Sequence, residues 1–345
     1  MAFSTIDKGS LHMNPVLYES NGTAIGSGGL TVTGFDFQPD WLGLKQRDAD
    51  ESWGTYDAVR GTTKSMRFNG TEAEDTRTEG VTAFNSNGFT CGSDSRINPS
   101  GTHPMVSYGW KAGGSTSPNT VGTIESTVSV NTTAGFSIAT WTGVTGAGTM
   151  GHGLGGVDCI ITKNTNSARD WYWWNSSMAY TTRLEMNNTE AFTTGTDNMT
   201  QLPDATKIYW DDSTQNNGTG EEYVGYFFQE IPGYSKFSNY TGNGNSDGTF
   251  VYTGFKPSFV MAKRTDSTDD WMLYDDAIST YNQTTYAMRP NVGNGEQSGN
   301  YIDMLSNGFK IRISGASLNA SGGSYVYMAF GQPIISNSGV CATAR

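Results

Sequence analysis

Short runs of apolar residues, separated by polar turn-forming residues, recur along the whole chain. The clearest runs are Trp41–Lys45, Cys159–Lys163 and Phe259–Lys263, and each is followed by a polar stretch and then by a tryptophan. Short runs rich in β-branched and aromatic residues, bounded by turn residues, are typical of strands. No segment sustains the 3.6-residue apolar period of an amphipathic helix. The pattern therefore predicts an all-β protein with little helix.

The spacing of lysine, tryptophan and later aromatic residues indicates an internal repeat. A tryptophan stands eight residues after each lysine, and a further aromatic residue ends a later apolar run at a similar distance. The three sets are Lys45, Trp53 and Trp110; Lys163, Trp171 and Phe228; and Lys263, Trp271 and Phe330. A fixed period of this kind is typical of tandem structural units. We predict three antiparallel β-sandwich (jelly-roll-like) repeats of about 100 residues, at 1–114, 121–233 and 234–345, with a linker at 115–120.

The segment Lys263–Asp276 contains five carboxylates, a density that can indicate a Ca²⁺ or Mg²⁺ site or the paired acids of a hydrolase. The matching loops at 46–52 and 164–170 do not keep these acids in place. We therefore expect a solvated hairpin loop without a metal, in which Asp266, Asp269 and Asp270 are candidate surface contacts.

The residue four positions after each tryptophan is more constant than the loop acids. It is Asp57, Asn175 and Asp275 in the three repeats. We interpret this recurrence as a structural hydrogen-bond acceptor at a strand end, because catalysis has no evident need for three copies.

Aromatic residues beside the tryptophans suggest a binding surface. Alternation along a strand places Trp171 and Trp173 on one face and Tyr172 and Trp174 on the other. If the tryptophan face is core, then Tyr172, Trp174, Tyr56 and Tyr274 are candidate receptor or interface contacts near the surface. The alternative is that both faces are covered, one by the sandwich core and the other by a neighbouring subunit.

Other candidate chemistry is weak. Residues Asn243–Gly248 match the start of a calcium loop, but Gly254 stands where the closing acid is needed, so a hairpin is favoured. The three histidines, His12, His103 and His152, have no metal-binding or triad spacing. We predict no cofactor and no enzymatic activity.

Composition narrows the possible partners. The chain has a net charge of −12 and a pI near 4.6, which argues against a nucleic-acid partner. There is no run of eighteen apolar residues and no signal-peptide pattern, so neither membrane insertion nor secretion is expected. The three cysteines, Cys91, Cys159 and Cys341, are too few and too scattered for a disulfide framework, which is consistent with synthesis in a cytoplasm.

Several strings resemble one family. They are Phe3–Met13, Asn131–Ile138, Gly151–Gly155, Ser235–Gly244 and Thr253–Pro257. Together they resemble the tail-fibre-like, repeat-containing virion proteins of tailed phages, especially phages of marine bacteria and cyanobacteria. The resemblance extends over nearly the whole chain and concerns architecture rather than chemistry.

The resemblance implies a β-rich virion structural protein, made in the host cytoplasm and carried on the extracellular particle. We expect a tail fibre or appendage component that attaches to a host-surface glycan, with other virion proteins as partners. We also expect a homo-oligomer, with a trimer favoured, because repeated copies multiply weak contacts. The alternative is a capsid decoration or cement protein, or a head fibre, that stabilises the particle.

Overall fold

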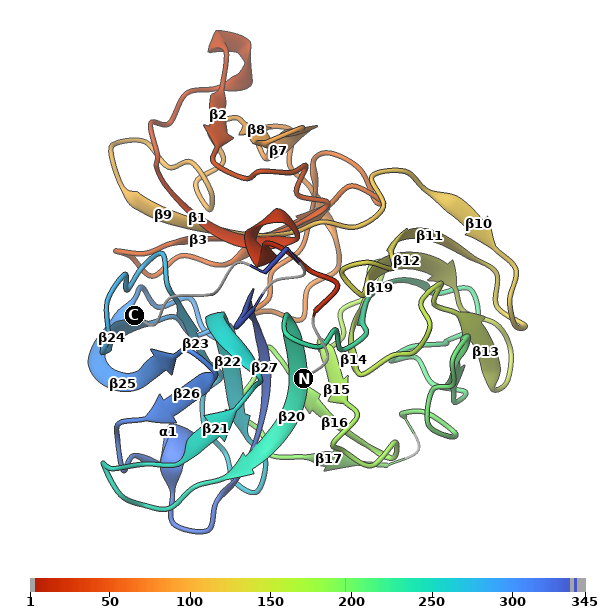
Figure 1. Ribbon diagram of the computed structural model, residues 1–345. Helices are drawn as coiled ribbons and strands as arrows, with labels where there is room; N and C mark the ends of the chain where they lie inside the picture. The colour runs from red at the N-terminus through yellow and green to blue at the C-terminus, as the bar shows by residue number, and fades with distance from the viewer. Residues whose placement is uncertain (1–3, 196, 336–337, 340–345) are drawn as a thin grey trace.

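The computed structural model describes residues 4–195, 197–335 and 338–339, and these residues form three lobes around a common centre (Figure 1). Lobe 1 contains strands β1 to β9, lobe 2 contains β10 to β19, and lobe 3 contains β20 to β27. The described residues include only one α-helix, α1 (Ala316–Asn319), and two short 3₁₀ turns, η1 (Gly9–Leu11) and η2 (Ile25–Ser27). The predicted all-β class with little helix is confirmed.

The strands of lobe 1 are short, as the spacing of its turn residues indicates. They are β1 (Met13–Glu19), β2 (Leu30–Thr33), β3 (Trp41–Gln46), β4 (Gly54–Asp57), β5 (Lys64–Ser65), β6 (Asp75–Thr76), β7 (Val81–Asn85), β8 (Gly88–Cys91) and β9 (Pro104–Trp110).

Lobe 2 has more strands than lobe 1. They are β10 (Ser117–Asn119), β11 (Ser126–Asn131), β12 (Phe136–Thr142), β13 (Gly148–Gly151), β14 (Cys159–Asn164), β15 (Tyr172–Asn175), β16 (Thr182–Glu185), β17 (Thr193–Thr194), β18 (Lys207–Trp210) and β19 (Glu222–Phe228). The predicted linker 115–120 includes β10, which pairs with β11 as an edge strand.

Lobe 3 completes the described chain. Its strands are β20 (Ser235–Thr241), β21 (Phe250–Tyr252), β22 (Phe255–Arg264), β23 (Met272–Asp275), β24 (Thr284–Ala287), β25 (Gln297–Leu305), β26 (Gly308–Ile311) and β27 (Ser324–Pro333).

Each lobe has an inner sheet with the same strand order. The antiparallel orders are β1-β9-β3-β4 in lobe 1, β12-β19-β14-β15 in lobe 2 and β20-β27-β22-β23 in lobe 3. In lobe 2 this sheet is extended by β10 and β11 at one edge and by β16 and β17 at the other. The matched apolar runs of the sequence therefore occupy matching places, although the exact division into repeats stays a prediction.

A second, outer sheet lies in each lobe. Its strands are β2-β8-β7 in lobe 1, β13-β18 in lobe 2 and β21-β26-β25-β24 in lobe 3. Separate buried clusters fill lobes 1 and 3, and include Leu42 and Phe89 in lobe 1 and Val260 and Phe309 in lobe 3. Each lobe is thus β-sandwich-like, and the buried residues between the two sheets of lobe 2 are continuous with the central cluster.

The other face of each inner sheet points to the common centre, where aromatic rings from all three lobes pack together. Trp41 stacks on Tyr226 at 4.3 Å between ring centroids, and Phe330 lies 5.7 Å from both Trp110 and Phe228. One buried cluster accordingly runs from Ile6 to Phe330. The lobes share a core, which a row of independent repeats would not.

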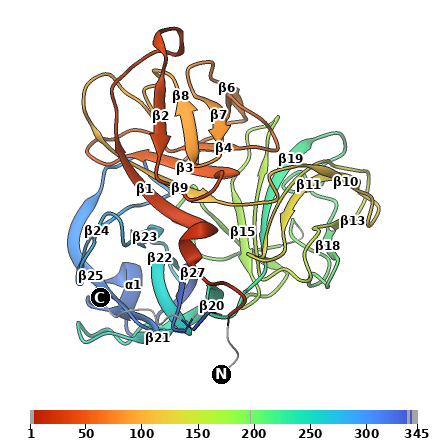
Figure 2. The same cartoon turned by 45° about the horizontal axis from the view of Figure 1, so that its top comes forward.

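The chain closes on itself where lobe 3 meets the N-terminal segment. The Gly9 N–H donates to Gln332 Oε1 at 2.8 Å, and Gln332 Nε2 donates to the Asp7 carbonyl at 2.7 Å. A Cβ at Gly9 would lie 2.1 Å from the Gly331 carbonyl oxygen, so only glycine fits this approach. Figure 2 shows lobe 1 above lobes 2 and 3, so that the three form a ring rather than a line.

Candidate functional site

Matching backbone hydrogen bonds join each lobe to the next around the ring. In each case the N–H near the end of the polar loop, two residues before the tryptophan, donates to a carbonyl of another lobe. The bonds run from Arg169 to Thr71 (2.9 Å), from Asp269 to Thr189 (2.9 Å) and from Glu51 to Gly293 (3.0 Å). Lobe 2 thereby donates a hydrogen bond to lobe 1, lobe 3 donates one to lobe 2, and lobe 1 donates one to lobe 3.

The three tryptophans of the repeat are residues of these joints. All three side chains are buried, and each indole N–H donates to a carbonyl of the neighbouring lobe. The bonds are Trp171 to Arg67 (2.6 Å), Trp271 to Glu185 (3.0 Å) and Trp53 to Arg289 (3.1 Å). A buried indole N–H needs an acceptor, which explains why the same residue recurs at each joint.

The lysine eight residues earlier is buried beside the same joint. Lys163 Nζ donates to the carbonyls of Thr71 and Arg169, at 2.9 and 2.7 Å. Lys263 does the same with Thr189 and Arg264, whereas Lys45 binds carbonyls of its own loop. Burial lowers the pKa of each ammonium group to about 8.

Asp57, Asn175 and Asp275 are structural acceptors at strand ends, as expected. Asp57 Oδ1 accepts the backbone N–H groups of Val59 and Arg60, and the other two residues bind their following turns in the same way. Each side chain also reaches the next lobe. The contacts are Tyr226 Oη to Asp57 Oδ2 (2.8 Å), Tyr108 Oη to Asp275 Oδ2 (2.7 Å) and Asn175 Nδ2 to the Ser238 carbonyl (3.2 Å).

The acidic loop after Lys263 directs its carboxylates toward neighbouring protein groups. Asp270 binds Arg289 at 2.7 Å, and Asp266, whose side chain is exposed, pairs with Arg264 at 2.8 Å. Asp269 is half-buried and its pKa is raised by that burial. In the described part of the chain no three His, Cys, Asp or Glu side chains are grouped to hold a metal ion. Asp266 is the member of this set best placed for a surface contact.

The four aromatic residues predicted to lie near the surface are in fact buried. The exposed fraction of Tyr56, Tyr172, Trp174 and Tyr274 is 1% or less. The reason is the outer sheet, which covers the face opposite the anchor tryptophans; for example, Tyr172 packs edge-on against Trp210 of β18 at 5.9 Å. Both faces are therefore covered within one chain, and these four residues cannot contact a receptor.

Other aromatic and aliphatic side chains are exposed instead. The most exposed are Tyr281 (80%), Tyr252 (60%) and Leu202 (53%). They lie in loops or on the edge strand β21, where the sequence pattern gave no tryptophan anchor to draw attention to them.

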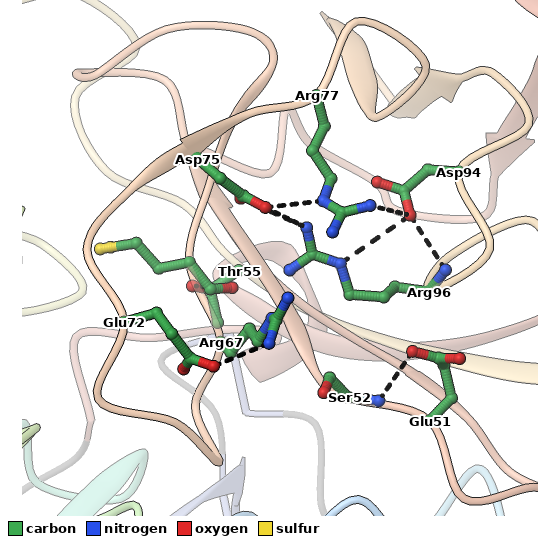
Figure 3. A network of polar contacts seen from close by, with 10 residues as sticks. Glu51, Ser52, Thr55, Arg67, Glu72, Asp75, Arg77, Asp94 and Arg96 are labelled. Atoms are coloured by element: carbon green, nitrogen blue, oxygen red, sulfur yellow. Dashed lines mark hydrogen bonds and ion pairs between the residues drawn. The ribbon is translucent and has the colours of Figure 1, made fainter. Parts of the chain in front are cut away.

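A partly buried charge cluster in lobe 1 gave no signal in the sequence. Figure 3 shows Asp75 between the guanidinium groups of Arg77 and Arg96, and Asp94 between the same two arginines. Arg96 and Asp94 are almost fully buried, and burial raises the pKa of Asp94. Two acids face two bases, so the charges of the cluster balance, and its ion pairs join the segment at Asp75 and Arg77 to the segment at Asp94 and Arg96.

The calcium-like segment Asn243–Gly248 uses its oxygen atoms internally. The Asn243 and Asn245 side chains accept backbone N–H groups of their own loop at 2.9 Å. Asp247 pairs with Lys310 at 2.8 Å, which lowers the pKa of the Asp247 carboxyl. These contacts are typical of a polar hairpin.

A polar cleft of about 490 Å³ lies between lobes 1 and 2, and the sequence analysis did not identify it. The floor of the cleft is formed by the lobe 2 sheet, on the face that points to the common centre but at the end of the strands farthest from that centre. Pairing places Thr127 opposite Thr140, and Thr142 opposite Glu222, on that face. Trp141 points the other way, to Trp210, so this end of the sheet presents hydroxyl and carboxylate groups.

The wall of the cleft comes from lobe 1. Arg60 pairs with Asp57 at 2.5 Å and with Glu74 at 2.9 Å, and Glu74 also binds Lys64. The Arg60 side chain is only 5% exposed, and its Nη2 atom has no hydrogen-bond partner among the described residues. Met178 and Ile278 stand three residues after Asn175 and Asp275, so lobe 1 alone has an arginine at this position.

Within the described residues no helix is long or apolar enough to cross a membrane.

The chain matches no curated protein and no solved structure. A family model described as a domain of unknown function, DUF7483, matches residues 8–333, a span that includes all three lobes and every joint between them. The chain therefore belongs to the DUF7483 family.

Proposed function

We propose that this chain is a virion structural protein of a tailed phage and that it attaches the particle to a glycan on the host surface. The observation that carries the proposal is the ring itself. Buried lysine, tryptophan and aspartate side chains, the groups from which active sites are often built, are used at the joints to bind one lobe to the next. Such use favours a mechanical role over catalysis.

A rigid ring suits a particle component that must keep its shape while it is exposed to solvent. The polar cleft between lobes 1 and 2 supports the attachment role, because it offers hydroxyl and carboxylate groups to a passing ligand. In this proposal the protein acts with other virion proteins and as a homo-oligomer, a trimer being favoured. Several copies on one particle would then add weak contacts into firm attachment.

Adsorption competition tests this proposal. Purified chain, mixed with host cells before the phage, is expected to slow adsorption of the particles in proportion to its concentration. A chain heated past its unfolding transition serves as the control. Unchanged adsorption at saturating protein would contradict the attachment role.

The second candidate is a decoration protein that clamps coat subunits. The exposed side chains of Tyr252 and Tyr281 favour it, since aromatic residues commonly anchor protein interfaces. A decoration protein is expected to co-purify with tailless capsids in a number set by the coat lattice. An attachment protein is expected to be absent from them.

A further inference from the structure

We propose that the cleft between lobes 1 and 2 is a carbohydrate site, and that it takes neutral or amine-bearing sugars rather than acidic ones. The inference rests on the proposed attachment function and identifies the chemical class of its ligand. It concerns the cleft lined by Arg60, Glu74, Glu125, Thr127, Thr140, Thr142 and Glu222.

The first argument is the shape and origin of the cleft. Its volume of about 490 Å³ lies within the range of about 300–1,000 Å³ that is usual for small-molecule sites. Strands β10 and β11, which widen the inner sheet of lobe 2 beyond the edge reached in the other lobes, supply part of its lining. The extra strands thus create a floor that the architecture of the ring does not itself require.

The second argument is the change of chemistry along the inner face of this sheet. Near the centre of the ring the face carries Phe136 and Phe228, which pack together at 4.7 Å. Further out on the same strands and the same face it carries Thr140, Thr142 and Glu222. Glu222 and Thr142 are exposed, and hydroxyl and carboxylate groups are the partners that sugar hydroxyls need.

The wall of the cleft is fixed by ion pairs of Arg60. Arg60 Nε and Nη1 are bound by Asp57 and Glu74, while the buried Nη2 lacks an acceptor among the described residues. The Nη2 atom is itself buried, so Arg60 acts by holding Glu74 and Asp57 in the wall of the cleft, and a ligand meets the exposed groups of the floor.

The charge of the cleft favours neutral and amine-bearing sugars over acidic ones. Three carboxylates, Glu74, Glu125 and Glu222, line the cleft against the single cation Arg60. The side chains of Glu125 and Glu222 have no ion-pair partner in the described part of the chain. An acidic sugar would meet this negative field and be repelled, whereas hydroxyl and ammonium groups would be attracted.

The test uses the full chain, labelled with a fluorophore, on an array of neutral, amine-bearing and acidic oligosaccharides. Binding is expected on neutral or amine-bearing members. The tightest of these is then titrated against Thr142→Ile, which fills part of the floor and removes a hydroxyl. Affinity is expected to fall about tenfold, equivalent to about 1.4 kcal/mol.

Thr241→Ile is the matched control, because Thr241 ends β20, the strand of lobe 3 that corresponds to β12, and is equally exposed. It is expected to leave affinity unchanged. Glu222→Gln is a second variant that keeps the shape of the cleft and is expected to reduce the preference for amine-bearing over acidic sugars. Melting temperatures of all variants verify folding.

Three results would overturn the inference: no binding on the array, binding confined to acidic sugars, or unchanged affinity in Thr142→Ile. Adsorption competition by the same variant separates this inference from the proposed function. If Thr142→Ile loses sugar binding and still competes, the cleft is a sugar site but not the attachment site. If neither wild type nor variant competes, the attachment function fails while the array result still decides the chemistry of the cleft.

Discussion

Among single residues, the position four residues after each anchor tryptophan has different partners and a different electrostatic environment in each lobe. Asp57 and Asp275 both accept a tyrosine hydroxyl from the next lobe. Lobe 3 has Met328 at the position of that tyrosine, and Asn175 donates to the Ser238 carbonyl instead. Asp57 has Arg60 as a buried counter-ion, but Asp275 has no such cation among the described residues, and burial raises its pKa to about 6. The two aspartates should therefore respond differently to loss of charge.

Replacement of each aspartate by asparagine tests this difference. Asp57→Asn leaves the buried Arg60 poorly compensated and is expected to lower the free energy of unfolding by about 3 kcal/mol. Asp275→Asn removes a desolvated charge and keeps the turn acceptor, so a change of less than about 1 kcal/mol is expected at pH 7. Chemical denaturation measures both. Equal losses would contradict the assigned roles.

Asp275 should also contribute to the pH dependence of stability. Its folded pKa of about 6 lies above its ordinary value of 3.8, so between these values the folded chain binds more protons than the unfolded chain. The stabilisation is complete below pH 3.8 and is lost as the pH rises through 6. The Asp275→Asn variant is expected to lose this component, seen as a flatter stability curve between pH 4 and 6.

The buried lysines at the joints, Lys45, Lys163 and Lys263, change the pH dependence of stability in the opposite direction to Asp275. Their folded pKa of about 8 lies below the ordinary value of 10.5, so the unfolded chain binds more protons in between. The free energy of unfolding is expected to rise as the pH increases from 7 to 9, before the tyrosines of the unfolded chain titrate. Denaturation at each pH measures it, and Lys163→Met should reduce the rise. A fall over this range in the wild type would contradict the assignment.

Among the elements, the strands β4, β15 and β23 that follow the polar loops are buried on both faces. The anchor tryptophans fill the joints, and residues such as Trp174 fill the sandwich of their own lobe. Trp174→Ala is therefore expected to cost about 3–5 kcal/mol of stability through the cavity it creates. Tyr281→Ala, at an 80% exposed position, is the control and is expected to change stability by less than about 0.5 kcal/mol. A mild effect of Trp174→Ala would mean that this face is open.

Much of the inner sheet could be predicted from the sequence. The run Trp41–Lys45 becomes β3 with one residue added, and the strands after the polar loops begin one residue beyond Trp53, Trp171 and Trp271. The recurrence of Asp57 and its counterparts correctly predicted acceptors at strand ends. These features are local, and the alternation and spacing of neighbouring residues carry them.

The rest depends on contacts between distant segments, which periodicity does not encode. Alternation places Tyr172 and Trp174 on the face opposite Trp171, but it cannot tell that β13 and β18 will cover that face. The cleft likewise combines Glu74 with Thr142, which are brought together only when lobe 2 binds lobe 1. The one weak sign of the cleft in the sequence is in β12, where the alternating apolar residues Phe136 and Ile138 are followed on the same face by Thr140 and Thr142.

At the scale of the whole molecule, the ring makes every lobe depend on both others. Lobe 3 binds lobe 2 through Trp271 and receives Trp53 from lobe 1. A chain of residues 1–233 should expose both of these joints and lose cooperative unfolding, as followed by tryptophan fluorescence and calorimetry. Repeats that fold independently in a row would survive this deletion with a sharp transition.

If the protein serves attachment, as we propose, it lies at the tail of the phage particle or on its appendages. The most direct measurement is electron microscopy of purified particles labelled with gold-conjugated antibody against the folded chain. Gold is expected at the tail or its appendages on intact particles and is not expected on tailless capsids. Gold spread over the capsid would favour decoration instead, and particles without any label would contradict a place on the virion.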